Sequence, residues 1–94
     1  MLTLVIYDIS NDKDRNKLAE LLLDFGLERI QYSGFKGNLN FHDCNVLAKK
    51  VKQFISSSND SIYIIRLCNE CVKTCKIVSK RDIPLIDESM VKIV

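Results

Sequence analysis

The chain has 94 residues and a mass of 10.8 kDa, which corresponds to one small domain. Hydrophobic residues make up 47% and charged residues 28%, with one proline and three glycines, which excludes the disordered, collagenous and low-complexity classes. The formal net charge of +2 is too small for a basic tail, yet it is compatible with contact to a phosphate backbone. A domain of this size buries only about 60–65% of its unfolded surface, so a second subunit often covers part of the remainder.

No secretory signal or membrane span is expected. The chain begins with a mainly apolar run, but the run ends at Asp8 and lacks a basic leader. It is also far shorter than the roughly 20 residues that a membrane span needs. We therefore expect a cytoplasmic protein with no membrane partner, whose cysteines are mostly reduced rather than joined in a disulfide framework.

The first quarter of the chain predicts a strand and then a helix. Residues 2–9 are almost all apolar and rich in β-forming side chains, which is typical of a strand buried on both faces. Asn11 and Asp14 resemble a helix-capping pair at the start of a segment with leucines at helical spacing. That helix is expected to end near Phe25, with Gly26 as the residue that follows its last turn.

The middle of the chain predicts extended structure, a second helix and another strand. Residues 27–39 indicate two short strands, or one strand broken at Ser33-Gly34, where a glycine favours a bulge, with Gly37-Asn38 closing the segment. Residues 43–56 carry an apolar stripe at helical spacing. The run 62–67 then predicts a strand with little alternation.

The last quarter is less regular. Residues 69–74 predict one helical turn, and 76–79 a short strand. The strict alternation of 90–94 predicts a C-terminal strand, within a segment of about 88–94 that we expect to pair with the sheet edge of a partner chain.

The order β-α-β-β-α-β with an added C-terminal strand predicts an α+β, ferredoxin-like sandwich over residues 1–94 as a single domain. In this plan both helices cover one face of an antiparallel sheet and leave the other face bare. Because the strands are apolar on both sides, a second copy of the chain is expected to cover the bare face. The pattern therefore predicts a homodimer.

Asp8 is the most informative acidic residue. It ends an apolar strand, where a carboxylate contributes nothing to the core, and it precedes a helix start. One interpretation is a strand-end residue that caps the next turn. The other is a ligand for a hard cation, because a dimer axis would bring two Asp8 carboxylates together, and two carboxylates with waters and a phosphate suit Mg²⁺ or Mn²⁺. A metal held there would orient a water and stabilise charge on a scissile phosphate.

Two arginines are candidates for phosphate contact. Arg15 lies one turn into the first helix and Arg29 opens the second strand, and such positions gather on a shared rim. Taken singly, each is better explained as an ordinary surface arginine. The lysines at 49, 50 and 52 are explained by the solvated face of an amphipathic helix.

The cysteines Cys68 and Cys71 form one Cys-x-x-Cys pair, with Cys75 four residues later. Structural zinc usually takes two such pairs, and only a distant His42/Cys44 offers completion, so small buried thiols packing a helical turn are favoured over zinc.

The first two fifths of the chain resemble the CRISPR-associated protein 2 family, the small partner of the spacer-acquisition integrase. The series that carries the resemblance is Tyr7-Asp-Ile9, Arg15, Gly26-Leu-x-Arg-Ile-Gln-Tyr-Ser33, Phe35 and Gly37. The resemblance implies a ferredoxin-like homodimer and a metal-dependent endonuclease that acts on single-stranded RNA or duplex DNA. It implies that Asp8 binds the metal and is catalytic. It also implies that other residues flank a nucleic-acid cleft: Tyr7, Arg15, Arg29, Ser33 and Phe35. Within that cleft, Arg15 and Arg29 would hold phosphate, and Phe35 would shape the cleft or stack on a base.

Three functions follow from the residues and the resemblance together. The first is Mg²⁺- or Mn²⁺-dependent hydrolysis of nucleic acid at paired Asp8 residues. The second is a non-catalytic scaffold that bridges the CRISPR-associated integrase and holds duplex DNA, for which Asp8 would be dispensable. The third is a toxin-like ribonuclease outside CRISPR systems.

Overall fold

The computed structural model describes residues 1–80 and 92–93. The chain begins with β1 (Leu2–Asp8) and α1 (Asp12–Asp24), followed by β2 (Glu28–Gln31) and β3 (Gly34–Asn38). It continues with α2 (Phe41–Val51), the 3₁₀ turn η1 (Lys52–Phe54) and β4 (Ser61–Leu67). The order ends with α3 (Asn69–Thr74), β5 (Lys76–Ile77) and β6 (Lys92–Ile93).

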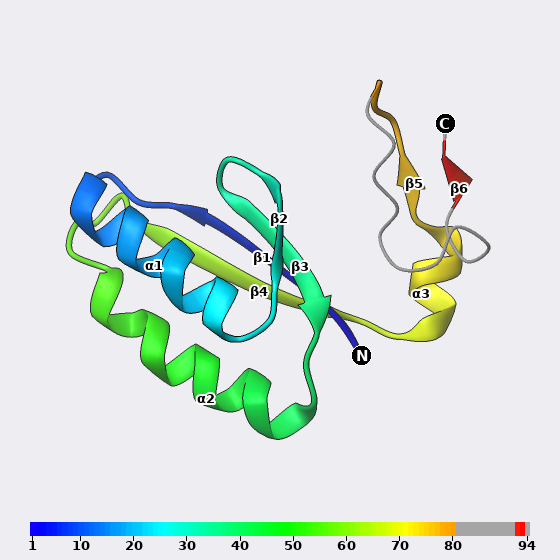
Figure 1. The fold of residues 1–94 in the computed structure, drawn as a ribbon, viewed down its shortest axis with the longest axis horizontal. Coiled ribbons are helices and arrows are strands. Elements are labelled where there is room, and N and C mark those ends of the chain that lie inside the picture. Colours follow the sequence, from blue (N-terminus) through cyan, green and yellow to red (C-terminus); the bar gives the residue numbers. More distant parts are fainter. Residues whose placement is uncertain (81–91, 94) are drawn as a thin grey trace.

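Strands β1 to β4 form one antiparallel sheet in the order β2-β3-β1-β4. The first strand is central, and β3 and β4 flank it. Helices α1 and α2 lie on one face of this sheet (Figure 1). The predicted α+β class and the β-α-β-β-α-β order are therefore confirmed.

The first helix begins after a capping asparagine and ends before a glycine, as the sequence predicts. The Asn11 side chain accepts a hydrogen bond from the Asp14 backbone N–H at 2.9 Å, which satisfies one of the free donors of the first turn. Gly26 follows the helix with a φ of +83°, a left-handed conformation that favours glycine. Leu18 and Leu22 are fully buried and point the apolar face of α1 into the core.

The hairpin of β2 and β3 corrects two details of the sequence prediction. The irregular register lies between Arg29 and Gln31 rather than at Gly34. Gly37 lies inside β3 and closes no turn. A Cβ at position 37 would lie 2.5 Å from Leu27 Cδ2 and 3.2 Å from Leu27 Cα, so glycine is there because two backbone segments approach closely.

The second helix starts two residues earlier than predicted, at Phe41 rather than Asp43. The reason is a cap: the Asn40 side chain accepts a hydrogen bond from the Asp43 backbone N–H at 2.7 Å. The helix also ends earlier than predicted, at Val51, and η1 tightens the last turn up to Phe54. The predicted turn at 69–74 is α3, and β4 begins at Ser61.

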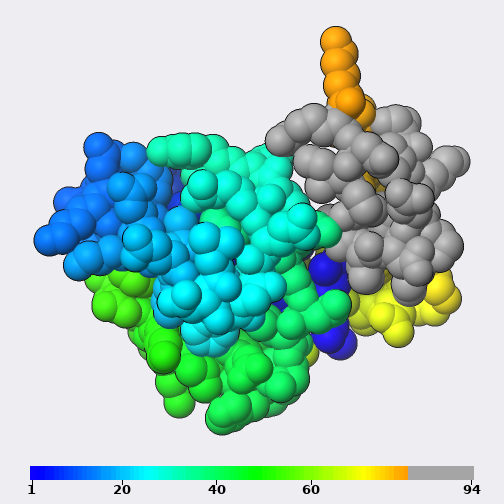
Figure 2. Space-filling view, viewed as in Figure 1, coloured from blue at the N-terminus to red at the C-terminus, as the bar shows by residue number. Residues whose placement is uncertain are grey.

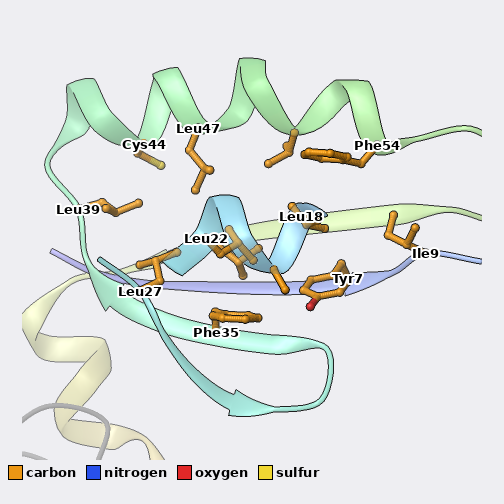
Figure 3. Packing of buried hydrophobic residues seen from close by; sticks show 13 residues of the cluster. Tyr7, Ile9, Leu18, Leu22, Leu27, Phe35, Leu39, Cys44, Leu47 and Phe54 are labelled. Atoms are coloured by element: carbon orange, nitrogen blue, oxygen red, sulfur yellow. The ribbon is translucent and has the colours of Figure 1, made fainter. Parts of the chain in front are cut away.

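The core lies between the two helices and the sheet (Figure 3). Phe35 from β3 has no exposed surface and lies on the sheet side of the core, beneath Leu22 and near Tyr7. The cluster that surrounds it consists of Val5, Tyr7, Ile9, Leu18, Ala19, Leu22, Leu27, Leu39, Cys44, Leu47, Val51 and Phe54. Val5 and Tyr7 of β1 are apolar because they point into this cluster.

The opposite face of the sheet carries exposed apolar side chains. Ile6 of β1 is 47% exposed, and its β4 neighbour Tyr63 is 61% exposed. Ile65, opposite Leu4, is 39% exposed. Because strand side chains alternate, Asp8 lies on the same face as Ile6. We call Ile6, Tyr63 and Ile65 the open-face patch.

The C-terminal strand prediction is partly within the described residues. In the described part, β6 pairs in parallel with β5 of its own chain, in the register Lys76 to Lys92 and Ile77 to Ile93. Most of the predicted segment 88–94 lies outside the described residues, and its pairing with a partner chain stays a prediction. Among the described residues, no helix is long and apolar enough to cross a membrane.

Candidate nucleic-acid site

Asp8 is the last residue of β1, and its side chain is exposed on the open face of the sheet. Its backbone pairs with Ser61 at the start of β4, so the sheet fixes its position. Within the described residues, the Asp8 carboxylate forms no hydrogen bond or ion pair. It therefore does not cap the next turn: Asn11 does. A carboxylate that is exposed and unpaired keeps all its lone pairs for an external cation.

The β2–β3 turn is fastened to β1 directly beside Asp8. The Tyr7 backbone N–H donates to the Ser33 carbonyl at 3.1 Å. The Tyr7 hydroxyl donates to the Tyr32 carbonyl at 3.5 Å, which is a long contact. Ser33 thus holds the turn through its backbone carbonyl, and the buried Tyr7 orients the turn through its backbone N–H and its hydroxyl.

Two arginines converge on the ring of Tyr32. The Arg15 Cζ lies 5.6 Å and the Arg29 Cζ 6.0 Å from the centre of that ring. The Arg29 Cζ is also 5.0 Å from the ring centre of Phe35. Cation–π contacts of this kind hold both guanidinium groups at one rim. In Figure 2, α1 and the β2–β3 hairpin, which carry these arginines, lie side by side on one face of the molecule.

Arg15 links this rim to the end of β1. Its Nη1 donates to the carbonyl of Ile9, the residue after Asp8, at 3.1 Å. Its Nη2 contacts the Asp12 carboxylate, which raises the pKa of Arg15 above its ordinary value and keeps the guanidinium charged. The buried Nε of Arg15 has no hydrogen-bond partner among the described residues. The Arg15 guanidinium therefore already has two partners within the fold, Ile9 and Asp12, whereas Arg29 is exposed.

The structure places Tyr7, Arg15, Arg29, Ser33 and Phe35 around the β2–β3 hairpin and buries two of them. Phe35 is fully buried and Tyr7 is 4% exposed, with their rings 6.2 Å apart in a stacked arrangement. A ring without exposed surface is not able to stack on a base, so that predicted role of Phe35 is wrong for the single chain.

Tyr32 is the exposed ring that sequence reasoning missed. It is 68% exposed and stands between the two arginines. A tyrosine next to a Ser-Gly turn, in a strand that alternates with polar residues, was the signal available in the sequence. Because every base has a flat π-face, an exposed aromatic ring flanked by cations is suited to single-stranded nucleic acid.

Asp60 was also missed, and it holds the Asp8 loop in place. Its Oδ1 accepts hydrogen bonds from the Ser10 backbone N–H at 3.0 Å and from the Ser10 hydroxyl at 2.9 Å. Its Oδ2 accepts from the backbone N–H groups of Ser56 and Ser57. These N–H groups, those of Ser10 and Ser56 first, lower the pKa of Asp60 well below its usual range. The loop after β1 is thereby tied to the loop before β4.

The residues that could hold a metal are few. No group of three or more histidine, cysteine, aspartate or glutamate side chains suited to a metal occurs in the part of the chain that the structure describes. Asp8 supplies one carboxylate per chain, which suits Mg²⁺ only if a second carboxylate, waters or phosphate oxygens complete the shell. The alternative expectation for the thiols, that they are buried, is wrong for Cys68 and Cys71, which are exposed.

The lysines of α2 and η1 lie apart from this site. Lys49, Lys50 and Lys52 are exposed, as expected for a solvated helix face. Lys50 lies over the ring of Phe25 at 5.7 Å.

Fold and site together define a small α+β protein with an unpaired strand-end carboxylate beside an arginine–aromatic cluster. The sequence pattern of the family "CRISPR associated protein Cas2" matches residues 1–75, which include every residue of this site. The chain belongs to this family.

Relatives support the assignment, one of them over the whole length of the chain. A "CRISPR-associated endoribonuclease Cas2" from Archaeoglobus fulgidus is 47% identical over 94 residues, which is 100% of both chains. A "CRISPR-associated endonuclease Cas1/endonuclease Cas2 fusion" from Thermoproteus tenax is 31% identical over 74 residues, covering 79% of this chain and 28% of the fusion. The second relative joins a Cas2 segment to another CRISPR-associated endonuclease in one polypeptide.

Solved structures share the fold. A hypothetical protein from Thermus thermophilus superposes with a TM-score of 0.65 and 33% identity, covering 71% of this chain and 80% of that one. Streptococcus pyogenes Cas2 gives a TM-score of 0.64 and 27% identity, covering 72% and 87%.

Proposed function

We propose that the chain is a Mg²⁺- or Mn²⁺-dependent endoribonuclease of CRISPR adaptation that acts as a homodimer. The observation that carries the proposal is the Asp8 carboxylate, which is exposed, unpaired among the described residues, and one residue away from the carbonyl that anchors Arg15. The endoribonuclease name of the relative from Archaeoglobus fulgidus supports the choice of RNA, with duplex DNA as the other substrate to be tested.

The open-face patch supports a dimer. Ile6, Tyr63 and Ile65 are exposed apolar side chains on the face of the sheet opposite α1 and α2. Covering this face with a second copy removes apolar surface from water, which favours association. Asp8 shares that face with Ile6, so a two-fold axis there is suited to bringing two carboxylates to one cation.

In this proposal each part of the site has its own task. Two Asp8 carboxylates would supply oxygen ligands, and the bound cation would supply positive charge to the scissile phosphate. Arg29, which is exposed, would bind a neighbouring phosphate through its guanidinium fork, and Arg15 would add charge at the same rim. Tyr32 would stack on a base and place the strand along the rim. Asp60 would keep the loop after Asp8 fixed.

The test is cleavage of single-stranded RNA and of duplex DNA, with Mg²⁺, with Mn²⁺ and with a chelator. Asp8→Asn is expected to lower cleavage by at least about 100-fold, because the neutral amide is a far weaker ligand for a hard cation. The matched control is Asp24→Asn, an exposed carboxylate at the far end of α1, which should cleave like the wild type. Equal cleavage by the wild type and Asp8→Asn would refute the catalytic proposal.

The dimer has a separate test. Ile6→Glu places a charge in the open-face patch and is expected to yield monomers in sedimentation experiments, with cleavage lost although Asp8 is intact. Asn45→Glu, on the exposed side of α2, is the control that should remain dimeric. A dimer that survives Ile6→Glu unchanged would show that the open face is not the interface.

A second candidate function is a bridge for the CRISPR-associated integrase that holds duplex DNA without cutting it. The fusion relative from Thermoproteus tenax favours it, because a fused pair of proteins is brought together for a shared task. If Asp8→Asn supports spacer integration with the integrase as well as the wild type does, the bridge is the function that matters. No observation favours a toxin-like ribonuclease, since the matched family is CRISPR-associated.

A further inference from the structure

Two cysteine thiols meet at the surface where β4 passes into α3. Cys68 is the residue before α3 and Cys71 lies in its first turn, and both are exposed. Their sulfur atoms are 3.4 Å apart. A disulfide bond is about 2.05 Å long, so the two thiols are close enough to join after a small side-chain movement.

The two thiols differ in acidity. The pKa of Cys68 is lowered, first by the backbone N–H of Cys71 and then by the Cys71 thiol, both of which favour a negative sulfur. The pKa of Cys71 is raised, chiefly because its thiol is hydrogen-bonded to Cys68 and lies next to that charge. Cys68 is therefore the thiol of the pair that loses its proton more readily, which favours it as the attacking sulfur.

The other two cysteines are placed differently. Cys44 is buried in the core, and Cys75 is half-buried with its thiol donating to the Cys71 carbonyl at 3.3 Å. Among the described residues no group of three metal-binding side chains includes this pair. The arrangement suits redox chemistry of two thiols better than metal binding.

We propose that Cys68 and Cys71 form a thiol–disulfide exchange site that takes small-molecule disulfides of the glutathione type. The Cys68 thiolate attacks one sulfur of the disulfide, forms a mixed disulfide and releases one thiolate. The Cys71 thiol then loses its proton, attacks the Cys68 sulfur and releases the second thiolate. The two cysteines are oxidised to one disulfide, and one external disulfide is reduced to two thiols.

The fold holds this pair in place and separates it from Asp8. Val72 is fully buried and packs with Leu2, which fixes α3 against the end of the sheet. Asp8 pairs with Ser61 at the first residue of β4, whereas Cys68 follows the last. In Figure 1, α3 lies at the end of the domain opposite the β1–α1 junction. The exchange site is thus independent of the proposed cleavage site.

The experiment is titration with oxidised glutathione, followed by trypsin digestion and mass spectrometry. Trypsin cleaves after Arg66, Lys73 and Lys76, so Cys68 and Cys71 share peptide 67–73 while Cys75 lies in peptide 74–76. The expected product is peptide 67–73 lighter by two hydrogen atoms and resistant to alkylation. Reduction with dithiothreitol should restore the original mass. A cross-link between 67–73 and 74–76, or no oxidation at all, would overturn the proposal.

Variants separate the two roles. Cys71→Ser is expected to accumulate glutathione on Cys68, because the resolving thiol is missing. Cys68→Ser is expected to slow the reaction of peptide 67–73 by at least about tenfold, since the acidic thiol is gone. Cys75→Ser is the control and should oxidise like the wild type. Accumulation of glutathione on Cys71 in the wild type would refute the order of attack, and circular dichroism confirms that each variant is folded.

Discussion

Phe35 and Tyr32 test whether the buried aromatic ring of the hairpin stabilises the fold and the exposed one binds RNA. Phe35 is fully buried. Its ring centre lies 6.2 Å from the ring centre of Tyr7 and 5.0 Å from the Cζ of Arg29. Replacing it by leucine keeps an apolar side chain but removes both contacts. The stacked pair contributes about 0.5–1.5 kcal/mol, and the exposed cation–π contact about 0.5–1 kcal/mol.

We therefore expect Phe35→Leu to lower the free energy of unfolding by about 1–2.5 kcal/mol. For a domain of this size, that corresponds to a fall in the melting temperature of roughly 4–20 °C. The assay is urea and thermal unfolding followed by circular dichroism. RNA binding, measured by fluorescence anisotropy at a temperature where the variant is folded, should weaken less than in Tyr32→Leu, because Tyr32 still holds Arg29.

The comparison variant is Tyr32→Leu, which should affect RNA binding most. Its ring is 68% exposed and makes two cation–π contacts of about 0.5–1 kcal/mol each, so its loss is expected to lower the free energy of unfolding by about 1–2 kcal/mol. Loss of base stacking should weaken RNA binding by about 1–3 kcal/mol, or roughly 5- to 150-fold. If Phe35→Leu melts like the wild type and weakens RNA binding more than Tyr32→Leu does, the assignment of stability to Phe35 and of RNA binding to Tyr32 is wrong.

Three further predictions concern the elements that position the site. The lowered pKa of Asp60 means that its stabilisation is present at neutral pH and is lost as the pH falls below the ordinary value of 3.8. In urea unfolding, the free-energy gap between the wild type and Asp60→Asn should therefore be constant from about pH 7 to about pH 5 and narrow below about pH 4, and a gap that stays constant down to about pH 2 would contradict the assignment. Gly37→Ala should lower the free energy of unfolding by about 1–3 kcal/mol because its Cβ meets a neighbouring backbone, whereas Gly34→Ala, with 3.6 Å to its nearest neighbour, should change it much less. Asn11→Ala should lower the free energy of unfolding by about 1 kcal/mol because the helix cap is lost. Asn16→Ala, at an exposed position of α1 that caps nothing, should have little effect, and equal losses for the two variants in thermal melts would count against the cap.

Local sequence determined the elements and their order. The apolar run of β1, the Asn11 cap and the leucine spacing of α1 act over a few residues, so they are legible without any partner in space. The same holds for Asp8: a carboxylate at the end of a buried strand stands out in the sequence, and the structure leaves it exposed and unpaired among the described residues.

Only the tertiary structure decided which aromatic ring is buried and which is presented. Phe35 and Tyr32 lie three residues apart in one hairpin, yet one is fully buried and the other largely exposed, because Phe35 lies in β3 within the core whereas Tyr32 lies in the turn between β2 and β3. The role of Asp60 depends on a contact with Ser10 across 50 residues, which no local pattern encodes. Gly37 is required by the close approach of Leu27, the residue before β2, rather than by a turn. Such contacts arise only when distant segments pack together, so their physical cause lies in the assembled sheet and not in the order of residues along it.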